Sequence, residues 1–391
     1  MFENLDQIFL LLRDWIAGFL PVFLRPLVGT VLGVVGIASV FPALFALTTV
    51  FERKGLARMQ NRLGPNRVGP FGLLQPIADG VKSLTKEDVV PLSADGVVHF
   101  LAPLLLVVAV FMGFAVLPVG RNMVLVDLDC ALLFYFAMGA SSEVAVFMAG
   151  WSSRNKYSLL GAMRAVAQMI SYEVVLLLSS VAVVMITGSM SLTRIVAAQN
   201  QYSGVLPHWY IFTPWGLAAF AMYAIAGTAE TNRSPFDLPE GESELIAGYH
   251  TEYSGFKFAL FFLGEYLGMF SISGLGVTLF LGGWSAPFSF LGWIPSWIWF
   301  FAKVMLSIFV FIWVRGTLPR LRQDQLMNFA WKFVLPFTLF NLLVTALWRF
   351  MGDGWLRWAV CSALLAAAYL LMARTGMRRE QFTSRSYRYA E

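Results

Sequence analysis

A polar segment rich in carboxylates lies between two long apolar stretches of the chain. Residues 230–255 read ETNRSPFDLPEGESELIAGYHTEYSG and include six acidic side chains. Asp237, Glu240 and Glu244 would share one face if the segment turned helical after Pro239. Because like charges so close together cannot all ionise freely, at least one pKa in this group is expected to rise toward neutrality. The segment indicates proton or cation handling, and a solvated acidic loop that contacts a basic partner is the alternative.

Three further carboxylates, Glu143, Glu173 and Glu265, fall inside predicted membrane spans. A charge at the bilayer centre costs on the order of 3 kcal/mol on insertion scales. Any one of these groups could stay protonated and only hydrogen-bond a neighbouring helix, but a row of membrane carboxyls is what a proton relay requires. Lys303, in another predicted span, is a candidate partner for Glu143 or Glu265.

The helix that leads to Glu173 carries polar side chains along one face. Arg164, Gln168 and Ser171 lie at i, i+4 and i+7, so they must face protein or water. Glu173 lies about 13 Å beyond Arg164 along the helix axis. A carboxylate is therefore placed deep in the membrane beside a polar stripe.

Composition predicts the elements that position these side chains. Of 391 residues, 58% are hydrophobic and 13% charged, and the mean hydropathy is +0.69. Because a membrane helix needs roughly 20 apolar residues, we expect an all-α polytopic membrane protein. About nine transmembrane helices plus surface amphipathic helices would form a single membrane domain over 1–391. The spans are predicted near 28–51, 97–118, 128–151, 163–187, 212–229, 257–281, 296–315, 332–350 and 355–373.

The segment 1–27 is predicted as an N-terminal surface helix rather than a tenth span. Its apolar stretch is interrupted by Arg13, Asp14, Pro21 and Arg25, which fits a helix lying along the membrane surface. It lacks the basic leader and the small-residue cleavage site of a secretory signal, so we expect it to be retained.

An odd number of spans places the two termini on opposite sides of the membrane. Most of the 28 Lys and Arg residues then lie in segments on one side. The positive-inside rule makes that side cytoplasmic and puts the N-terminus outside. Cytoplasmic loops are predicted at 52–96, 152–162, 230–257 and 315–332, with a basic cytoplasmic tail at 374–391. Anionic membrane lipid at this face accounts for the net charge of +5 without a nucleic acid.

The first of these loops begins ERKGLARMQNRLGPNRVGPFGLLQPIADGVKSLTKED. Apolar side chains recur at helical spacing opposite Asp79, Lys82 and Lys86, which predicts an amphipathic helix in the membrane interface. Such a helix could bind lipid headgroups, or it could roof a pocket for an amphiphilic ligand such as a quinone. The sequence leaves both readings open.

Motifs for bound cofactors are sparse. Cys130 and Cys361 fall in predicted spans far apart in the sequence, so the chain offers no cysteine cluster for a metal ion or an iron–sulfur centre. It has no Walker loop and no GxGxxG after a strand. Any redox cofactor is therefore expected in another chain.

Four long blocks identify a family. They are the first-loop block above, AGWSSRNKYSLLGAMRAVAQMISYE, ETNRSPFDLPEGESELIAGYHTEYSGFKFALFFLGEY and RGTLPRLRQDQLMNFAWKFVLP. In these blocks, which span positions 52–336, the chain resembles the H subunits of the proton-pumping NADH:quinone oxidoreductases, respiratory complex I. Arg154 departs from the family, which commonly has Asn there; we expect an altered inner-surface contact rather than altered chemistry. The last span and the tail lie outside the blocks.

The resemblance implies a subunit of a proton-translocating enzyme of the bacterial plasma membrane, with no complete active site and no metal site in this chain alone. Quinone would be the substrate, admitted to a chamber formed with peripheral quinone-module subunits; FMN and iron–sulfur clusters would belong to partner subunits. The quinone-binding residues implied are Arg53, Asp79, Arg315 and Glu240. Proton transfer toward antiporter-like membrane subunits would use Glu143, Glu173, Glu230, Asp237, Glu240, Glu242, Glu244 and Glu265.

Three alternatives stay open. The equivalent membrane subunit of an energy-converting hydrogenase or formate hydrogenlyase shares ancestry with this family. A stand-alone cation/proton antiporter would also use buried acids, but large Gly/Pro-rich cytoplasmic loops favour docked partners. A passive anchor for a peripheral arm would leave the carboxyls in the spans unexplained.

Overall fold

The computed structural model describes residues 6–19, 21–237, 246–352 and 354–379. Its regular helices are α2 (Ile8–Gly18), α3 (Arg25–Met59), α4 (Gln75–Thr85), α5 (Gly96–Ala115), α6 (Ala131–Ser152), α7 (Lys156–Thr187), α8 (Leu192–Gln199), α9 (Pro214–Glu230), α11 (Gly255–Phe280), α12 (Ser296–Thr317), α13 (Gln323–Phe329), α14 (Leu335–Phe350) and α15 (Trp355–Arg379). Short helical turns are η1 (Pro70–Gly72), η2 (Tyr210–Phe212), η3 (Gly248–His250), η4 (Ser289–Leu291) and the π-helical η5 (Ala330–Val334). Two-residue strands β1 (Tyr202–Ser203) and β2 (Leu206–Pro207) pair antiparallel.

The predicted all-α membrane class is confirmed. Among the described residues, eight helical stretches are long and apolar enough to cross a membrane. The remaining predicted span, 212–229, forms α9, which has 17 residues and is shorter than each of these eight stretches, one of which runs over Gln323–Phe350. The predicted surface helix near the N-terminus is α2, whose 11 residues span only about 16 Å and cannot cross the hydrocarbon core.

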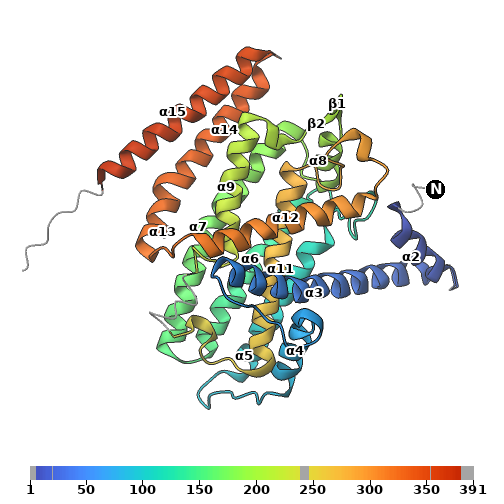
Figure 1. Cartoon of the computed structure of the whole chain (residues 1–391), viewed down its shortest axis with the longest axis vertical. Coiled ribbons are helices and arrows are strands. Elements are labelled where there is room, and N and C mark those ends of the chain that lie inside the picture. The colour runs from blue at the N-terminus through green and yellow to red at the C-terminus, as the bar shows by residue number, and fades with distance from the viewer. Residues whose placement is uncertain (1–5, 20, 238–245, 353, 380–391) are drawn as a thin grey trace, which may run out of the picture.

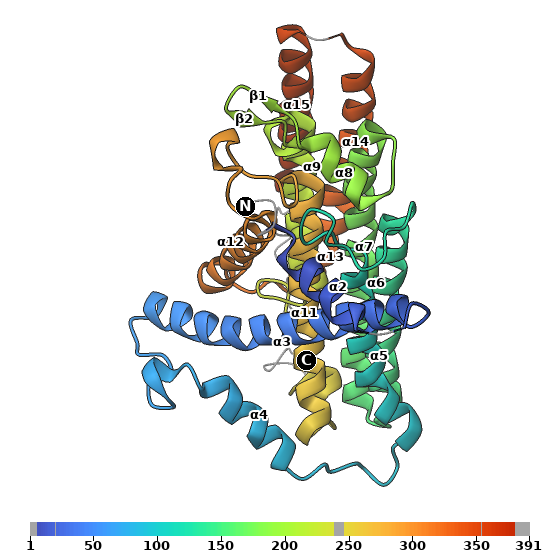
Figure 2. The same ribbon diagram turned by 90° about the vertical axis from the view of Figure 1, so that its right-hand side faces the viewer.

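Helix α3 is much longer than the predicted span of 28–51. It continues through ERKGLARM to Met59 and has 35 residues, or about 52 Å of helix. In both views α3 runs across the bundle that contains α5, α6, α7 and α11 (Figures 1 and 2). A helix of this length remains near a hydrocarbon layer of about 30 Å only when strongly tilted.

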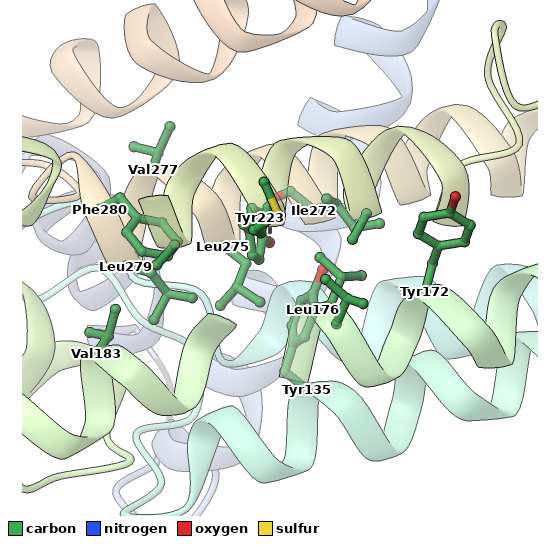
Figure 3. Packing of buried hydrophobic residues seen from close by; sticks show 14 of the residues in the cluster. Tyr135, Tyr172, Leu176, Val183, Tyr223, Ile272, Leu275, Val277, Leu279 and Phe280 are labelled. Atoms are coloured by element: carbon green, nitrogen blue, oxygen red, sulfur yellow. Dashed lines mark hydrogen bonds between the residues drawn. The ribbon is translucent and has the colours of Figure 1, made fainter. Parts of the chain in front are cut away.

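The interior of the bundle is apolar and closely packed. Figure 3 shows side chains of four helices meeting there: Tyr135 of α6, Leu176 of α7, Tyr223 of α9, and Ile272 and Leu275 of α11. Tyr223 is nearly fully buried, and its hydroxyl donates to the carbonyl of Ile272 over 2.8 Å. Burial of these side chains fixes the relative placement of the helices that carry the predicted acids.

Successive helices of the bundle run in opposite directions, so the connections gather at two ends. We call the acidic end the one formed by the connections α6–α7, α9–α11 and α12–α13, which are joined by polar contacts. The opposite end is formed by the connections α5–α6, α7–α9 and α11–α12, which also contact one another. Helix α4, the predicted amphipathic helix, leaves Ile77, Val81 and Leu84 exposed.

Candidate functional site

An internal cavity brings together predicted proton-transfer residues from three helices. Its volume is about 90 Å³, and its lining includes Glu173 of α7, Glu230 at the end of α9 and Glu265 of α11. Tyr135 and Ser271 also line it, and Ser271 Oγ donates to Tyr135 Oη over 2.9 Å. Most of the lining is apolar, but a space of this size has room for several water molecules beside the polar groups. Such waters can carry protons between carboxyls that do not touch.

Glu143 extends the acidic lining toward α6. It is 7% exposed, and the carboxyl of Glu173 lies against α6 at Gly139, one turn before Glu143. The carboxyls of Glu143, Glu173 and Glu230 interact electrostatically with one another. Groups coupled in this way share protons as a set, so a charge change at one alters the occupancy of the others.

Glu265 connects the cavity with the loop before α11. Tyr249 Oη donates to Glu265 Oε1 over 2.7 Å, and His250 Nε2 lies 3.6 Å from the same oxygen. Both ring-bearing residues belong to η3 and are buried. The next charged neighbour is Arg233, which acts electrostatically on Glu265.

A buried group of charges centred on Glu52 was not predicted from the sequence. Arg233 Nη1 lies 3.3 Å from Glu52 Oε1, Arg315 donates to the same oxygen, and Tyr266 Oη donates to Glu52 Oε2 over 2.7 Å. The Arg233 guanidinium also stacks over the Tyr266 ring at 3.9 Å. Burial alone would lower the pKa of Arg233, but Tyr266, Glu52 and Glu265 raise it above its usual value. Arg233 is thus a fixed positive charge between two carboxylates.

Glu52 carried a usable signal in the sequence. It stands where the apolar run of α3 turns into ERK, so its carboxylate had to pair with a cation or leave the membrane. The partner could not be identified, because Arg233 and Arg315 lie far along the chain. Of the predicted quinone-binding residues, Arg315 joins this buried group.

Arg53 and Asp79 form a second pair on the outer side of the same turn of α3. Arg53 Nη1 lies 2.6 Å from Asp79 Oδ2, and Gln75 Nε2 donates to Asp79 Oδ1 over 2.9 Å. The two charged side chains are 50% and 40% exposed. The pair fixes α4 against α3 and presents both charges to an open edge beside Glu52.

The start of the predicted acidic loop is anchored by Gln168 of α7. Its side-chain amide, predicted to face protein or water, is fully buried and donates to the carbonyls of Ala229 and Phe236 over 2.7 and 2.8 Å. The carbonyl of Asp237 accepts a hydrogen bond from Arg320, so the loop also contacts the connection that follows α12. Glu240 and Glu244 of the predicted helical face after Pro239, and Glu242 between them, lie outside the described residues.

The predicted pairing of Lys303 with a membrane carboxylate is wrong. Lys303 Nζ donates to the carbonyls of Leu281, Gly283 and Ser285 over 2.7, 2.9 and 2.7 Å. It also lies 4.1 Å from the centre of the Trp209 ring. These acceptors follow the C-terminus of α11, where carbonyls lack helical partners and attract a cation. Lys303 therefore belongs to the opposite end of the molecule.

Arg154 occupies a position that explains the departure noted in the sequence. It follows the C-terminus of α6 with φ of 51°, in the left-handed region that asparagine and glycine adopt more readily than arginine. Asparagine at this position is therefore favoured by backbone conformation. The difference concerns helix termination and lies away from the cavity.

Apolar spanning helices around buried carboxylates and guanidiniums define an integral membrane protein of the class that handles charge within the bilayer. Comparison with known proteins gives the family. The family model described as NADH dehydrogenase matches residues 32–346, and the chain belongs to this family. The match confirms the resemblance seen in the four sequence blocks.

Close relatives cover most of the chain. A protein of Thermomicrobium roseum is 48% identical over 329 residues, which are 81% of this chain and 94% of the relative. One of Paramagnetospirillum magneticum is 47% identical over 337 residues, 85% and 96% of the two chains. One of Geobacillus kaustophilus is 51% identical over 296 residues, 75% and 86%. Each of these relatives is named as the H subunit of NADH-quinone oxidoreductase.

Proposed function

We propose that this chain is the membrane subunit of a proton-translocating NADH:quinone oxidoreductase that borders the quinone chamber and couples quinone reduction to proton movement. The observation that carries the proposal is a nearly continuous row of charged groups. It begins at Arg315 and Glu52, passes Arg233 to Glu265, and continues through the cavity to Glu230 and Glu173. Family membership and the names of the relatives support the same conclusion.

The quinone would approach the edge formed by Arg53 and Asp79. Their exposed charges can contact a polar headgroup, whereas the buried Glu52 beneath them is already engaged by Arg233 and Arg315. Reduction of a quinone to a quinol consumes two electrons and two protons. The electrons would come from an iron–sulfur cluster of a partner subunit, and Glu240 would contribute to the same chamber.

Charge coupling would carry the effect of this reaction into the membrane. Proton uptake at the quinone removes positive charge from the acidic end, which changes the balance between Arg233 and its two carboxylates, Glu52 and Glu265. A proton shift at Glu265 can pass through water in the cavity to Glu230 and Glu173. Glu143 would transfer this proton shift toward an antiporter-like subunit.

The acidic end would be cytoplasmic, with the N-terminus outside and the chain in the plasma membrane of a bacterium. The positive-inside distribution of Lys and Arg supports this orientation. Peripheral quinone-module subunits would dock on the acidic end, where the connections carry Asp237 and Arg320, and on the exposed α4 between α3 and α5. FMN and iron–sulfur clusters would reside in partner subunits.

Purification of the tagged chain in mild detergent tests the proposal. We expect a large assembly that contains NADH-oxidising and iron–sulfur subunits and catalyses inhibitor-sensitive NADH:quinone reduction coupled to proton uptake into vesicles. Recovery with a nickel hydrogenase subunit would move the chain to the hydrogenase branch. Cation/proton exchange by the isolated chain would favour the antiporter.

A further inference from the structure

A second cavity lies at the opposite end of the molecule, away from the acidic network. Its volume is about 330 Å³, and it is formed by the start of α2, the α5–α6 connection, the segment before β1, and the connection from α11 to α12. This volume is within the range of small-molecule sites, roughly 300–1,000 Å³. The row of charges proposed for proton transfer does not reach it.

Two residues of opposite charge, Asp6 and Arg121, line this cavity. Asp6 accepts hydrogen bonds from the backbone N–H and hydroxyl of Ser296, with Ser296 N 2.7 Å from Asp6 Oδ1. The backbone N–H of Arg121 donates to Ser296 Oγ over 2.9 Å. Neither the Asp6 carboxylate nor the Arg121 guanidinium forms an ion pair with a described residue. Ser296 thus holds the Asp6 carboxylate and the backbone of Arg121 at the same cavity.

Indole rings form much of the remaining wall. Trp284, Trp293 and Trp299 line the cavity together with Tyr202. Tryptophan side chains are enriched at the level of lipid headgroups, and their faces attract ammonium groups.

Apolar side chains continue outward from the rim. Phe9 of α2 is 54% exposed and packs edge to face on Trp297 at 5.4 Å, while Phe290 is 66% exposed. These surfaces suit acyl chains that descend from a headgroup at the cavity. The site therefore combines a polar pocket with an adjoining lipid-facing surface.

We infer that this cavity binds the zwitterionic headgroup of a phospholipid, with the phosphate toward Arg121 and the ammonium toward Asp6 and the indole faces. A purely anionic headgroup would meet the Asp6 carboxylate, and a simple cation would meet the Arg121 guanidinium. A headgroup that carries both charges satisfies the two side chains together. This inference does not rest on the proposed function.

Photolabelling of the chain in its native assembly tests the inference. The assembly is placed in nanodiscs of phosphatidylglycerol that contain a trace of phosphatidylethanolamine with a diazirine in the upper part of one acyl chain. After illumination, peptides are analysed by mass spectrometry. We expect the probe to label the peptide that covers 281–299. Unlabelled phosphatidylethanolamine or phosphatidylcholine should compete with the probe and reduce this labelling. The stronger competitor identifies the preferred ammonium group. Failure to label this peptide, or equal displacement by added phosphatidylglycerol, would overturn the inference without the use of any variant.

Substitutions at the two charges provide the second arm. Arg121→Gln and Asp6→Asn should each reduce labelling of this peptide about tenfold, the equivalent of one charge-assisted hydrogen bond. Matched controls are Arg194→Gln and Asp129→Asn, which break an exposed pair at the same end and should leave labelling unchanged. Unaltered labelling in both test variants, or stronger labelling in Asp6→Asn, would show that the two charges do not recognise a zwitterionic headgroup.

Discussion

Glu52 of α3 and Arg233 after α9 are separated by 181 positions in the chain, yet their side chains form an ion pair of 3.3 Å. Their side chains are only 6% and 10% exposed. Because Arg233 also acts on Glu265, the pair joins the turn of α3 beside Arg53 to the acidic cavity. The packing of α3 across the bundle thus connects the proposed quinone edge with the proposed proton path.

Loss of the Glu52 charge should destabilise the fold. Glu52→Gln leaves Arg233 buried without its nearest carboxylate, and breaking a buried pair in this way costs about 3–5 kcal/mol. We expect a lower thermal midpoint and a lower yield of assembled complex. Asp14→Asn, which breaks an exposed pair with Arg13, is the matched control and should change stability by less than about 1 kcal/mol. Equal stability of the two variants would contradict the bridging role of Glu52.

Neutralisation of Glu173 should uncouple the enzyme. Glu173→Gln removes a proton-exchanging group from the cavity while keeping a side chain of the same size, so proton translocation should fall by about 10²-fold and fewer protons should be pumped per electron. Oxidation of NADH by an artificial acceptor at the peripheral arm should be unchanged. Glu87→Gln, at an exposed acid of the first loop, should retain both activities. Normal proton pumping per electron in Glu173→Gln would remove this residue from the path.

Local pattern and hydropathy identified much of this site in advance. The spans followed from apolar length. The spacing of Gln168 on the polar face of α7 predicted that it faces protein or water, and the structure buries it in protein. Glu173 and Glu265 were found because a carboxylate in an apolar span needs an explanation. Together with Glu230 they line one cavity. That arrangement depends on how three helices pack, and sequence periodicity gives no information on such packing.

The errors and omissions share a physical cause. Lys303 was assigned to a carboxylate because charge alone suggested a partner, but the carbonyls that follow α11 offered three acceptors nearer to its ammonium. Arg233 was not recognised as a buried charge because it lies in a loop rich in polar residues. Pairings between segments far apart in sequence depend on the path of the helices, and that path is set by tertiary packing.

The Arg53–Asp79 pair should affect quinone binding more than stability. Because both side chains are about half exposed, breaking their ion pair should cost less than about 1 kcal/mol of folding free energy. Arg53→Ala and Asp79→Asn should each raise the KM for quinone by about tenfold if the charge contacts the headgroup. Lys82→Gln, at an exposed position of α4, the helix that carries Asp79, should leave the KM for quinone unaltered. An unchanged KM in both test variants would exclude this edge from the chamber.

Asparagine in place of Arg154 should stabilise the protein. Arg154 has φ of 51°, and an ordinary side chain in this region costs roughly 1–2 kcal/mol, a cost that Asn reduces. Arg154→Asn should therefore raise stability by about 0.5–1 kcal/mol with no change in quinone reduction. Arg194→Asn, within the helix α8, should give no such gain. The measurement is the thermal midpoint of the purified assembly, and a lower midpoint for Arg154→Asn would contradict the backbone explanation.

Lys303 should behave as an anchor of the opposite end rather than as a member of the proton path. Lys303→Met leaves the carbonyls of Leu281, Gly283 and Ser285 without their common donor, at about 1–3 kcal/mol for each group left unsatisfied. We expect a clear fall in thermal stability, while proton pumping per electron below the unfolding temperature stays at the level of the unaltered protein. Lys332→Met, at an exposed lysine, is the control. Loss of pumping at normal stability would instead place the Lys303 ammonium in proton transfer, because its carbonyl contacts would then contribute little to the fold.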